Sequence, residues 1–460
     1  MPVRRPAPVA DSRVPVRSAS GRTGVRSPVR LRDHGAMAST TTDLAPLLAR
    51  YARRLHALAG TEHHVASPLG AWLLLAVCAS AAGPAAADGP YAAVARAAAR
   101  ELEDALGTSV DEAAAIAARM LAAPHQLVAA GAAVWNDPVV ATGGWQAWVE
   151  GLSAAIGTGP LPDQPALDTW ARQHSLGMIP QFPVPVTDET VALLATVLAT
   201  RVSWDVPFEL VPATRLGPTS PWADRLGQAL ATPPVPGRGH RPMIVASPLG
   251  DVAVHAGRAD GGLTVVSVAA DQDVPAAELL DLAHTLAPAL ALDEPVDARS
   301  LFDLPLGDGP LWSLTEEEVT STGWDSRVER ITAVLPAWSA SDQHGLDAPD
   351  LGFAAAARLL SALAGSPAPL PFEAVQAVAA SYDREGFEAA AVTAMAVATS
   401  ALASPRRTTR RTAELRFGHP YAVVAVTTDT PPRGRVDPTW RTPWHGTPAF
   451  SAWITTPTDP

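Results

Sequence analysis

The sequence of 460 residues contains no lysine and a single cysteine, Cys78. One cysteine cannot form an intramolecular disulfide, so the stability of the fold cannot depend on oxidation. Proline is abundant instead, with 45 residues, which is roughly twice its average share. Abundant alanine and proline without lysine are typical of proteins from GC-rich bacterial genomes, so single alanine and proline residues carry little weight as signals.

An excess of positive charge is also absent, because the formal net charge is −12. The first 36 residues hold eight arginines and two aspartates, a charge of +6, so the rest carries −12 − 6 = −18. An acidic main body argues against nucleic acid or an anionic membrane as the main partner. Residues 1–40 lack the apolar content to fold. They are predicted to be a disordered tail, or to precede a true start at Met37; a nucleic-acid-binding arm is the alternative. Residues 41–460 are predicted to form a single domain.

The familiar catalytic motifs are missing. There is no P-loop, no dinucleotide-binding glycine fingerprint and no serine nucleophile elbow. His63 and His64 are adjacent and cannot point to one face, which favours solvated loop histidines over a metal site. Cys78 lies in an apolar stretch, which predicts a buried, inert thiol. The acidic run Thr315–Val319 contains a capping box and predicts a solvated helix start. We therefore expect no enzyme, no cofactor and no metal.

Long apolar runs are scarce. The segment from Pro68 to Ala87 is the most apolar, but it is too short to span a bilayer and lies too far from the N-terminus for a signal peptide. It predicts a buried helix capped by Ser67 with Pro68 in its first turn. With no secretion signal visible, the expected location is cytoplasmic, with an extracellular location as the alternative.

Helical patterns fill the first third of the chain, and β-branched, strand-like runs concentrate later. This order predicts an α+β fold in which N-terminal helices pack on large mixed or antiparallel sheets. Periodicity leaves residues 189–204 open as helix or buried strand. The alanine-rich stretch from Asp383 to Ala401 has high helix propensity, yet it lies between two strand-like runs.

Several short motifs occur in a characteristic order along the chain. They are VASPLGAW beginning at Val65, AGAAVW beginning at Ala130, LDTWARQHSLGMI beginning at Leu167, RVSWDVPFE beginning at Arg201, AVLPAWS beginning at Ala333, REGFEAAAVTA beginning at Arg384, RFGHPYAVV beginning at Arg416 and PAFSAWITTPT beginning at Pro448. This series resembles the serpin family from about residue 42 to the end. The resemblance implies a monomeric inhibitor of a serine or cysteine endopeptidase. It also implies an exposed reactive loop at about residues 384–412, which is cleaved by the protease and then inserts into the central sheet. A non-inhibitory serpin-fold binding protein is the alternative.

The alanine-rich stretch resembles the hinge of the reactive loop. The hinge residues that this resemblance assigns are Glu385, Gly386, Phe387, Glu388, Ala389, Ala390, Ala391 and Thr393. In a strand, the alternate set that includes Phe387, Ala389 and Ala391 carries no charge and can enter a core, while Glu388 belongs to the other set. Small side chains also cost little ordering entropy. Phe387 departs from the family, which has a small residue there, and overpacking costs about 1–3 kcal/mol.

Two further departures concern the region beneath the opening sheet. Gln376 stands where the family usually has a buried histidine, and Thr196 stands where it has the asparagine partner. Both replacements are polar and able to form hydrogen bonds, near the matching helix start at Ser67. The resemblance assigns these three residues to the sheet-opening region.

The family's spacing from the hinge places the scissile bond near Ser400–Ala401. Thr399, Ser400, Ala401 and Leu402 suit an elastase-like or subtilisin-like protease with a small or apolar pocket. Arg406 and Arg407 are the alternative bait, for a trypsin-like protease whose acidic pocket pairs with arginine. The arginines lie farther from the hinge, and cleavage there would leave an overlong insert.

Overall fold

The computed structural model describes residues 43–83, 86, 88, 90–200, 202–233, 239–259, 261–321, 326–366, 370, 372–387, 406–429 and 441–460. The chain divides into two units, Met1–Thr42 and Asp43–Pro460, and every described residue belongs to the second unit. The predicted tail over residues 1–40 therefore lies outside the described residues.

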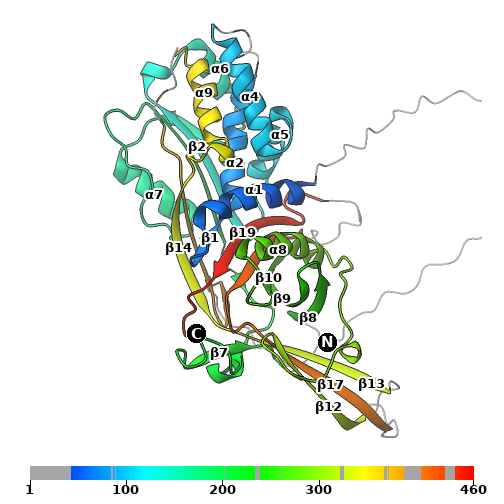
Figure 1. Cartoon of the computed structure of the whole chain (residues 1–460). Coiled ribbons are helices and arrows are strands. Elements are labelled where there is room, and N and C mark those ends of the chain that lie inside the picture. Colours follow the sequence, from blue (N-terminus) through cyan, green and yellow to red (C-terminus); the bar gives the residue numbers. More distant parts are fainter. Residues whose placement is uncertain are drawn as a thin grey trace, which may run out of the picture. The chain divides into compact units, whose positions relative to one another are not determined.

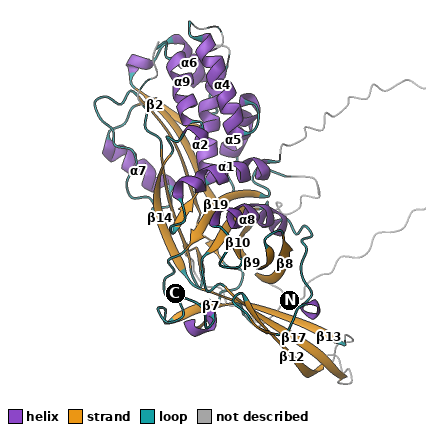
Figure 2. Ribbon diagram, in the orientation of Figure 1, coloured by secondary structure: helices purple, strands orange, loops and turns teal. Residues whose placement is uncertain are grey.

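Helices dominate the first part of the described chain (Figures 1 and 2). They are α1 (Leu44–Ala59), α2 (Pro68–Ala79), α4 (Ala92–Leu106), α5 (Val110–Ala122), α6 (Gly143–Gly151), α7 (Gln164–His174), α8 (Ala276–Ala291) and α9 (Phe353–Leu363). Short 3-10 turns are η1 (Ser80–Ala82), η2 (Pro138–Val140), η3 (Ala213–Leu216), η4 (Leu301–Asp303) and η5 (Pro349–Leu351). No helix in these ranges combines the length and the apolar character that a membrane crossing requires.

The apolar segment after Ser67 forms α2, as predicted. The Ser67 hydroxyl accepts the Gly70 N–H, and Pro68 occupies the first turn, where its missing N–H costs nothing. Nearly every side chain of α2 is buried, including Trp72 and Leu73. The helix is therefore a central element of the core, packed against α5, α1, β19 and β4.

One six-stranded sheet is antiparallel throughout, in the order β1-β19-β18-β10-β9-β8. Its strands are β1 (His64–Ala66), β8 (His240–Ser247), β9 (Gly250–Ala259), β10 (Leu263–Ala269), β18 (Tyr421–Thr427) and β19 (Thr447–Ile454). β10, β18 and β19 are buried along their whole length, and α8 covers them.

A second six-stranded sheet has the order β11-β12-β17-β13-β7-β6 and is mixed, because β13 and β17 run parallel. Its strands are β6 (Glu209–Pro212), β7 (Gln228–Ala231), β11 (Gly307–Asp308), β12 (Trp312–Ser321), β13 (Arg327–Leu335) and β17 (Arg406–Arg416). Three of them, β12, β17 and β13, extend together as a ribbon (Figure 1).

The remaining strands form three small sheets. β3 (Ile156–Pro160), β2 (Val128–Asn136) and β4 (Ala192–Thr200) form one in that order; β14 (Trp338–Gly345) pairs with β15 (Val375–Tyr382), and β16 (Gly386–Phe387) pairs with β5 (Val202–Ser203). The segment that periodicity left open is thus a strand, β4, over most of its length. Helices and mixed sheets together confirm the α+β prediction.

Two predictions made from local patterns were wrong. Thr315–Val319 lies inside strand β12, where its glutamates face the arginines of β17, and does not start a helix. His64 lies in β1 and is buried, with hydrogen bonds to His56 and to the Glu62 carbonyl, so it is not a solvated loop residue. In both places, long-range strand pairing overrides the local pattern.

Candidate functional site: an open position in the central sheet

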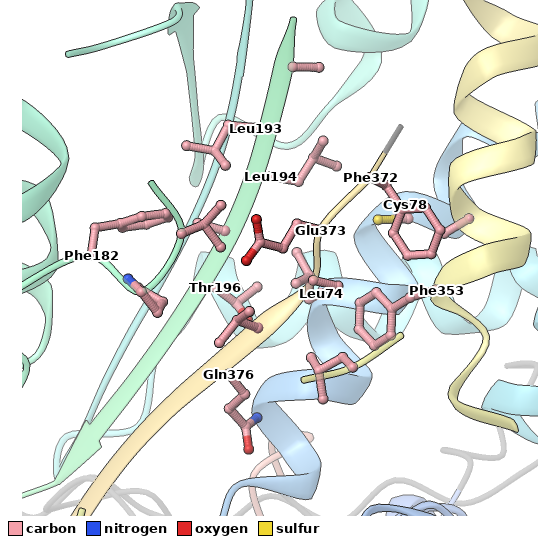
Figure 3. A pocket seen from close by; sticks show the side chains of 18 of the residues that line it. Leu74, Cys78, Phe182, Leu193, Leu194, Thr196, Phe353, Phe372, Glu373 and Gln376 are labelled. Carbon is pink, nitrogen blue, oxygen red and sulfur yellow. The ribbon is translucent and has the colours of Figure 1, made fainter. Parts of the chain in front are cut away.

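The edges of β4 and β15 face each other without pairing. β4 pairs with β2 over nine positions and β15 pairs with β14 over eight, but the described residues show no pairing between β4 and β15. A cavity of about 410 Å³ separates them, lined by residues of both strands (Figure 3). Strand edges carry unpaired N–H and C=O groups that accept an added strand.

The floor of this cavity is apolar. Leu74 and Cys78 of α2, Phe353 of α9 and Leu194 of β4 line it (Figure 3). Val378 of β15 lines it as well. Burial raises the pKa of the Cys78 thiol to about 12, so it remains protonated, in agreement with the predicted inert thiol. An added strand at this position would need small or apolar side chains on its inner face.

Strands β4 and β15 both form side-chain hydrogen bonds to the first turn of α2. Gln376 of β15 accepts the Ser67 N–H through Oε1 at 3.0 Å and donates to the Ser67 carbonyl through Nε2 at 2.8 Å. Thr196 of β4 donates to the Gly70 carbonyl at 2.9 Å. The Ser67 hydroxyl donates to the Ala449 carbonyl at 2.8 Å. The residues predicted for the sheet-opening region are therefore brought together, and each strand is bonded to the helix on its own side of the cavity.

The predicted hinge begins with a tight turn after β15. The Asp383 carboxylate accepts the N–H groups of Glu385 and Gly386 at 2.8 and 3.0 Å. Gly386 has φ of 143°, a backbone conformation that favours glycine. Gly386 and Phe387 then pair antiparallel with Ser203 and Val202. The chain has thus reversed direction and runs antiparallel to β5, just beyond the end of β4.

Trp204 and Phe208 hold this turn in place. Their backbone N–H groups donate to the carbonyls of Glu385 and Arg384 at 3.1 and 3.0 Å. The Trp204 indole donates to the Asp383 carbonyl at 3.0 Å, and both rings pack on Tyr382. The sequence motif around Trp204 suggested a family resemblance but not this role, which depends on residues about 180 positions later. The Asp-x-x-Gly spacing was the one local signal for the turn.

Two buried histidines stand behind these rings. His240 packs on Phe208 with ring centroids 4.2 Å apart, donates to or accepts from His255 across 3.1 Å, and bonds the Val206 carbonyl at 2.7 Å. Burial lowers the pKa of His240 to about 4 and that of His255 well below its ordinary value. The hinge turn therefore rests on groups whose burial disfavours protonation.

The rest of the predicted hinge lies outside the described residues: Glu388, Ala389, Ala390, Ala391 and Thr393. The predicted bait residues Thr399, Ser400, Ala401 and Leu402 also lie outside them, whereas the alternative bait lies within them. Arg406 and Arg407 begin β17, so the prediction of a loop as far as residue 412 was wrong from Arg406 onward. Glutamates across the strand pair explain the difference, because Arg407 pairs with Glu318 and Arg410 with Glu317.

A second, smaller cavity lies between α1 and α8, with a volume of about 220 Å³. Its lining is mostly apolar, including Ala57 and Leu280, and an ion pair between Arg53 and Asp281 at 2.7 Å stands among its residues. His284 also lines it, and neither ring nitrogen of this buried side chain has a hydrogen-bond partner. Burial lowers the pKa of His284 to about 4.

No family model and no curated protein matches the sequence. Solved structures do match. Serpin48 of the insect Tenebrio molitor is 13% identical, with 92% of this chain and 100% of that chain covered and a TM-score of 0.56. Human thyroxine-binding globulin with its bound hormone is 10% identical, with 92% and 100% covered and a TM-score of 0.57. The thermophilic serpin tengpin in its native state is 11% identical, with 90% and 94% covered and a TM-score of 0.53. These similarities show that the described unit has the serpin fold.

Proposed function

We propose that this serpin-fold protein inhibits a serine or cysteine endopeptidase by cleavage of the segment between β16 and β17 and insertion of its first part between β4 and β15. The main support for this proposal is the pairing of β16, whose two residues run antiparallel to β5. Continuation in the same direction leads along β4. The unpaired edges on both sides of the cavity would then gain strand partners.

The lengths support this proposal. β16 already pairs with Val202 and Ser203, so positions 192–201 leave ten residues of edge, about 33 Å of extended chain. Cleavage at Ser400–Ala401 frees residues 388–400, thirteen residues and about 43 Å. Cleavage after Arg407 would free twenty residues, about 66 Å. The shorter segment is the closer of the two to the length of the available edge.

The position of β17 also favours an elastase-like or subtilisin-like protease as the target. Proteases bind their substrates as extended chain with a free backbone, whereas β17 is paired with β12 from Arg406 onward. Thr399, Ser400, Ala401 and Leu402 remain as bait residues, and all four have small or apolar side chains that suit a small or apolar pocket.

The test is to mix the purified protein with elastase-like, subtilisin-like and trypsin-like proteases and to analyse the products by denaturing gel and intact mass. We expect a covalent complex with one of the first two and a released fragment that begins at Ala401. Protein nicked in the loop should melt on the order of 20 °C higher, because the inserted strand buries apolar surface. If all proteases nick the chain and none forms a complex, the inhibition proposal is wrong.

A second candidate, a ligand-binding serpin-fold protein, is favoured by the cavity between α1 and α8. A small aromatic molecule with one hydrogen-bonding group would fill about 220 Å³ and give the buried His284 a partner. Thyroxine-binding globulin among the similar structures is a protein of this kind.

This candidate is tested with p-cresol and 4-hydroxybenzoate as probes, by calorimetry on the wild type, His284→Leu and His174→Leu. His174 stacks on Trp170 outside this cavity and serves as the matched control. Binding that is lost only in His284→Leu supports the candidate. No binding by the wild type, or equal binding by both variants, contradicts it.

A further inference from the structure

Strand β17 follows the reactive segment and is held on both sides. It pairs antiparallel with β12 over ten positions, from Trp312↔Leu415 to Ser321↔Arg406. It pairs in parallel with β13 over eight positions, from Arg327↔Thr409 to Val334↔Arg416. β17 is therefore an inner strand of the ribbon, and β12 covers the edge that β13 leaves open.

Side chains reinforce the pairing with β12. Arg410 donates two hydrogen bonds to Glu317 Oε1, at 2.7 and 3.1 Å, and Arg411 pairs with Glu316 at 2.8 Å. Arg407 lies 3.4 Å from Glu318. The Arg411 side chain is only 16% exposed and also donates to the carbonyls of Leu301 and Leu304. A partly buried arginine with these three bonds contributes more than an exposed surface pair.

The direction of β17 makes it an obstacle to the uncleaved loop. Arg416 pairs with Val334, and the same chain continues through β14, where Trp338 pairs with Tyr382 beside the hinge. The Arg416 end of β17 therefore lies near the hinge, and the Arg406 end lies ten residues farther away along the ribbon (Figure 1). The cavity lies in the opposite direction from the hinge, beside Val375 to Val378 of β15.

The number of residues between the hinge and β17 limits how far an uncleaved loop can insert beside β4. If residues 388–400 filled the position beside β4, only residues 401–405 would remain to return to Arg406. Five residues span at most about 18 Å, against about 40 Å back to the hinge alone. An uncleaved loop can fill the position only if most of β17 leaves the ribbon.

We propose that β12 is a clamp on β17 that makes insertion depend on cleavage. This inference rests on the proposed function of the loop. Cleavage removes the tether, so insertion after cleavage needs no movement of β17. Without cleavage, the pairing along β12 and its three arginine–glutamate pairs must break first.

The experiment holds intact protein below its melting temperature and follows conversion to a more stable form, by melting curves and intact mass. Glu316→Gln, Glu317→Gln and Glu318→Gln are combined in one variant to weaken the clamp. Glu101→Gln, which breaks the Arg358–Glu101 pair between α4 and α9, is the control. We expect the triple variant to convert at least about tenfold faster than the wild type and the control, a difference equal to about 1.4 kcal/mol in barrier height.

A second variant is designed to strengthen the attachment of β17 to β12. Glu318 and Thr409 are directly opposite in the register, so Glu318→Cys with Thr409→Cys should form a disulfide across β12 and β17. The disulfide should abolish conversion of the intact chain until it is reduced, yet leave the gain in melting temperature after loop cleavage unchanged.

The outcomes separate the two proposals. If the triple variant converts no faster than the control while nicked protein still gains stability, the clamp is wrong and loop insertion stands. If the disulfide also blocks the gain after cleavage, β17 moves in both processes and the clamp is wrong. If nicking never raises the melting temperature, insertion does not occur and both proposals fail.

Discussion

The two described strands that flank residues 388–405, β16 and β17, are held in different ways. At its N-terminal end, β16 pairs over two positions with β5 and depends on a turn at Asp383. At its C-terminal end, β17 pairs over ten positions on one side and eight on the other. In the proposed mechanism, the hinge is therefore the moving end and β17 is the fixed end.

The largest expected effect concerns the face of the hinge that enters the core. Ala391→Arg places a charge in the set predicted to point inward, and burying an unpaired charge costs several kcal/mol. We expect complex formation with the target protease to fall more than about tenfold, since 1.4 kcal/mol already equals that factor. Ala390→Arg, in the other set, is the control. Equal losses in both variants would contradict the predicted alternation.

The next effect concerns the attachment of β15 to α2. Gln376→Ala removes both hydrogen bonds to Ser67, and we expect the free energy of unfolding to fall by about 2–3 kcal/mol. Gln376→His should recover part of this loss, because imidazole offers one donor and one acceptor. Gln343→Ala, at an exposed position of β14, is the control in urea unfolding. A loss no larger than in the control would show that the Gln376–Ser67 bonds do not stabilise the fold and that pairing with β14 and packing hold β15.

Lowering the pH should destabilise the hinge turn more than the pairing of β17 with β12. Burial lowers the pKa values of His240 and His255 in the folded protein, so their stabilising effect is complete above the unfolded value of about 6.5 and is lost as the pH falls below it. Each group contributes a slope of up to about 1.4 kcal/mol per pH unit. β12, β13 and β17 contain no histidine.

Hydrogen exchange at pH 7.5 and pH 5 provides the measurement. The protection of residues 383–387 relative to β17 should fall at pH 5, and it should fall less in His255→Leu. If residues 383–387 and β17 lost protection equally at pH 5, the predicted difference between them would be wrong.

The smallest effect concerns the hinge turn itself. Asp383→Ala leaves the N–H groups of Glu385 and Gly386 without their acceptor, and we expect a loss of about 1 kcal/mol in local stability. Faster exchange at Gly386 and Phe387 would report it, with Asp224→Ala, an exposed aspartate, as the control. Unchanged exchange would mean that Trp204 and Phe208 hold the turn without the carboxylate.

Prediction from sequence succeeded where local rules and residue order were sufficient. The Ser67 cap, the buried Cys78 and the α+β order of elements follow from capping, apolar content and periodicity. It failed for Thr315–Val319 and for the arginines after Arg406. Both segments have polar patterns that suit solvent, and each becomes a strand because the other supplies its hydrogen bonds and opposite charges about 90 residues away.

The sequence by itself determined the motif order, the small residues of the hinge and the polar identities of Gln376 and Thr196, because these properties belong to single residues or short windows. Only the tertiary structure decided that Gln376 and Thr196 both bond to the first turn of α2, that β16 already points along β4, and that β17 is enclosed by β12 and β13. Each of these facts depends on pairing between distant segments, and the register of such pairing is a property of the packed chain rather than of any short window.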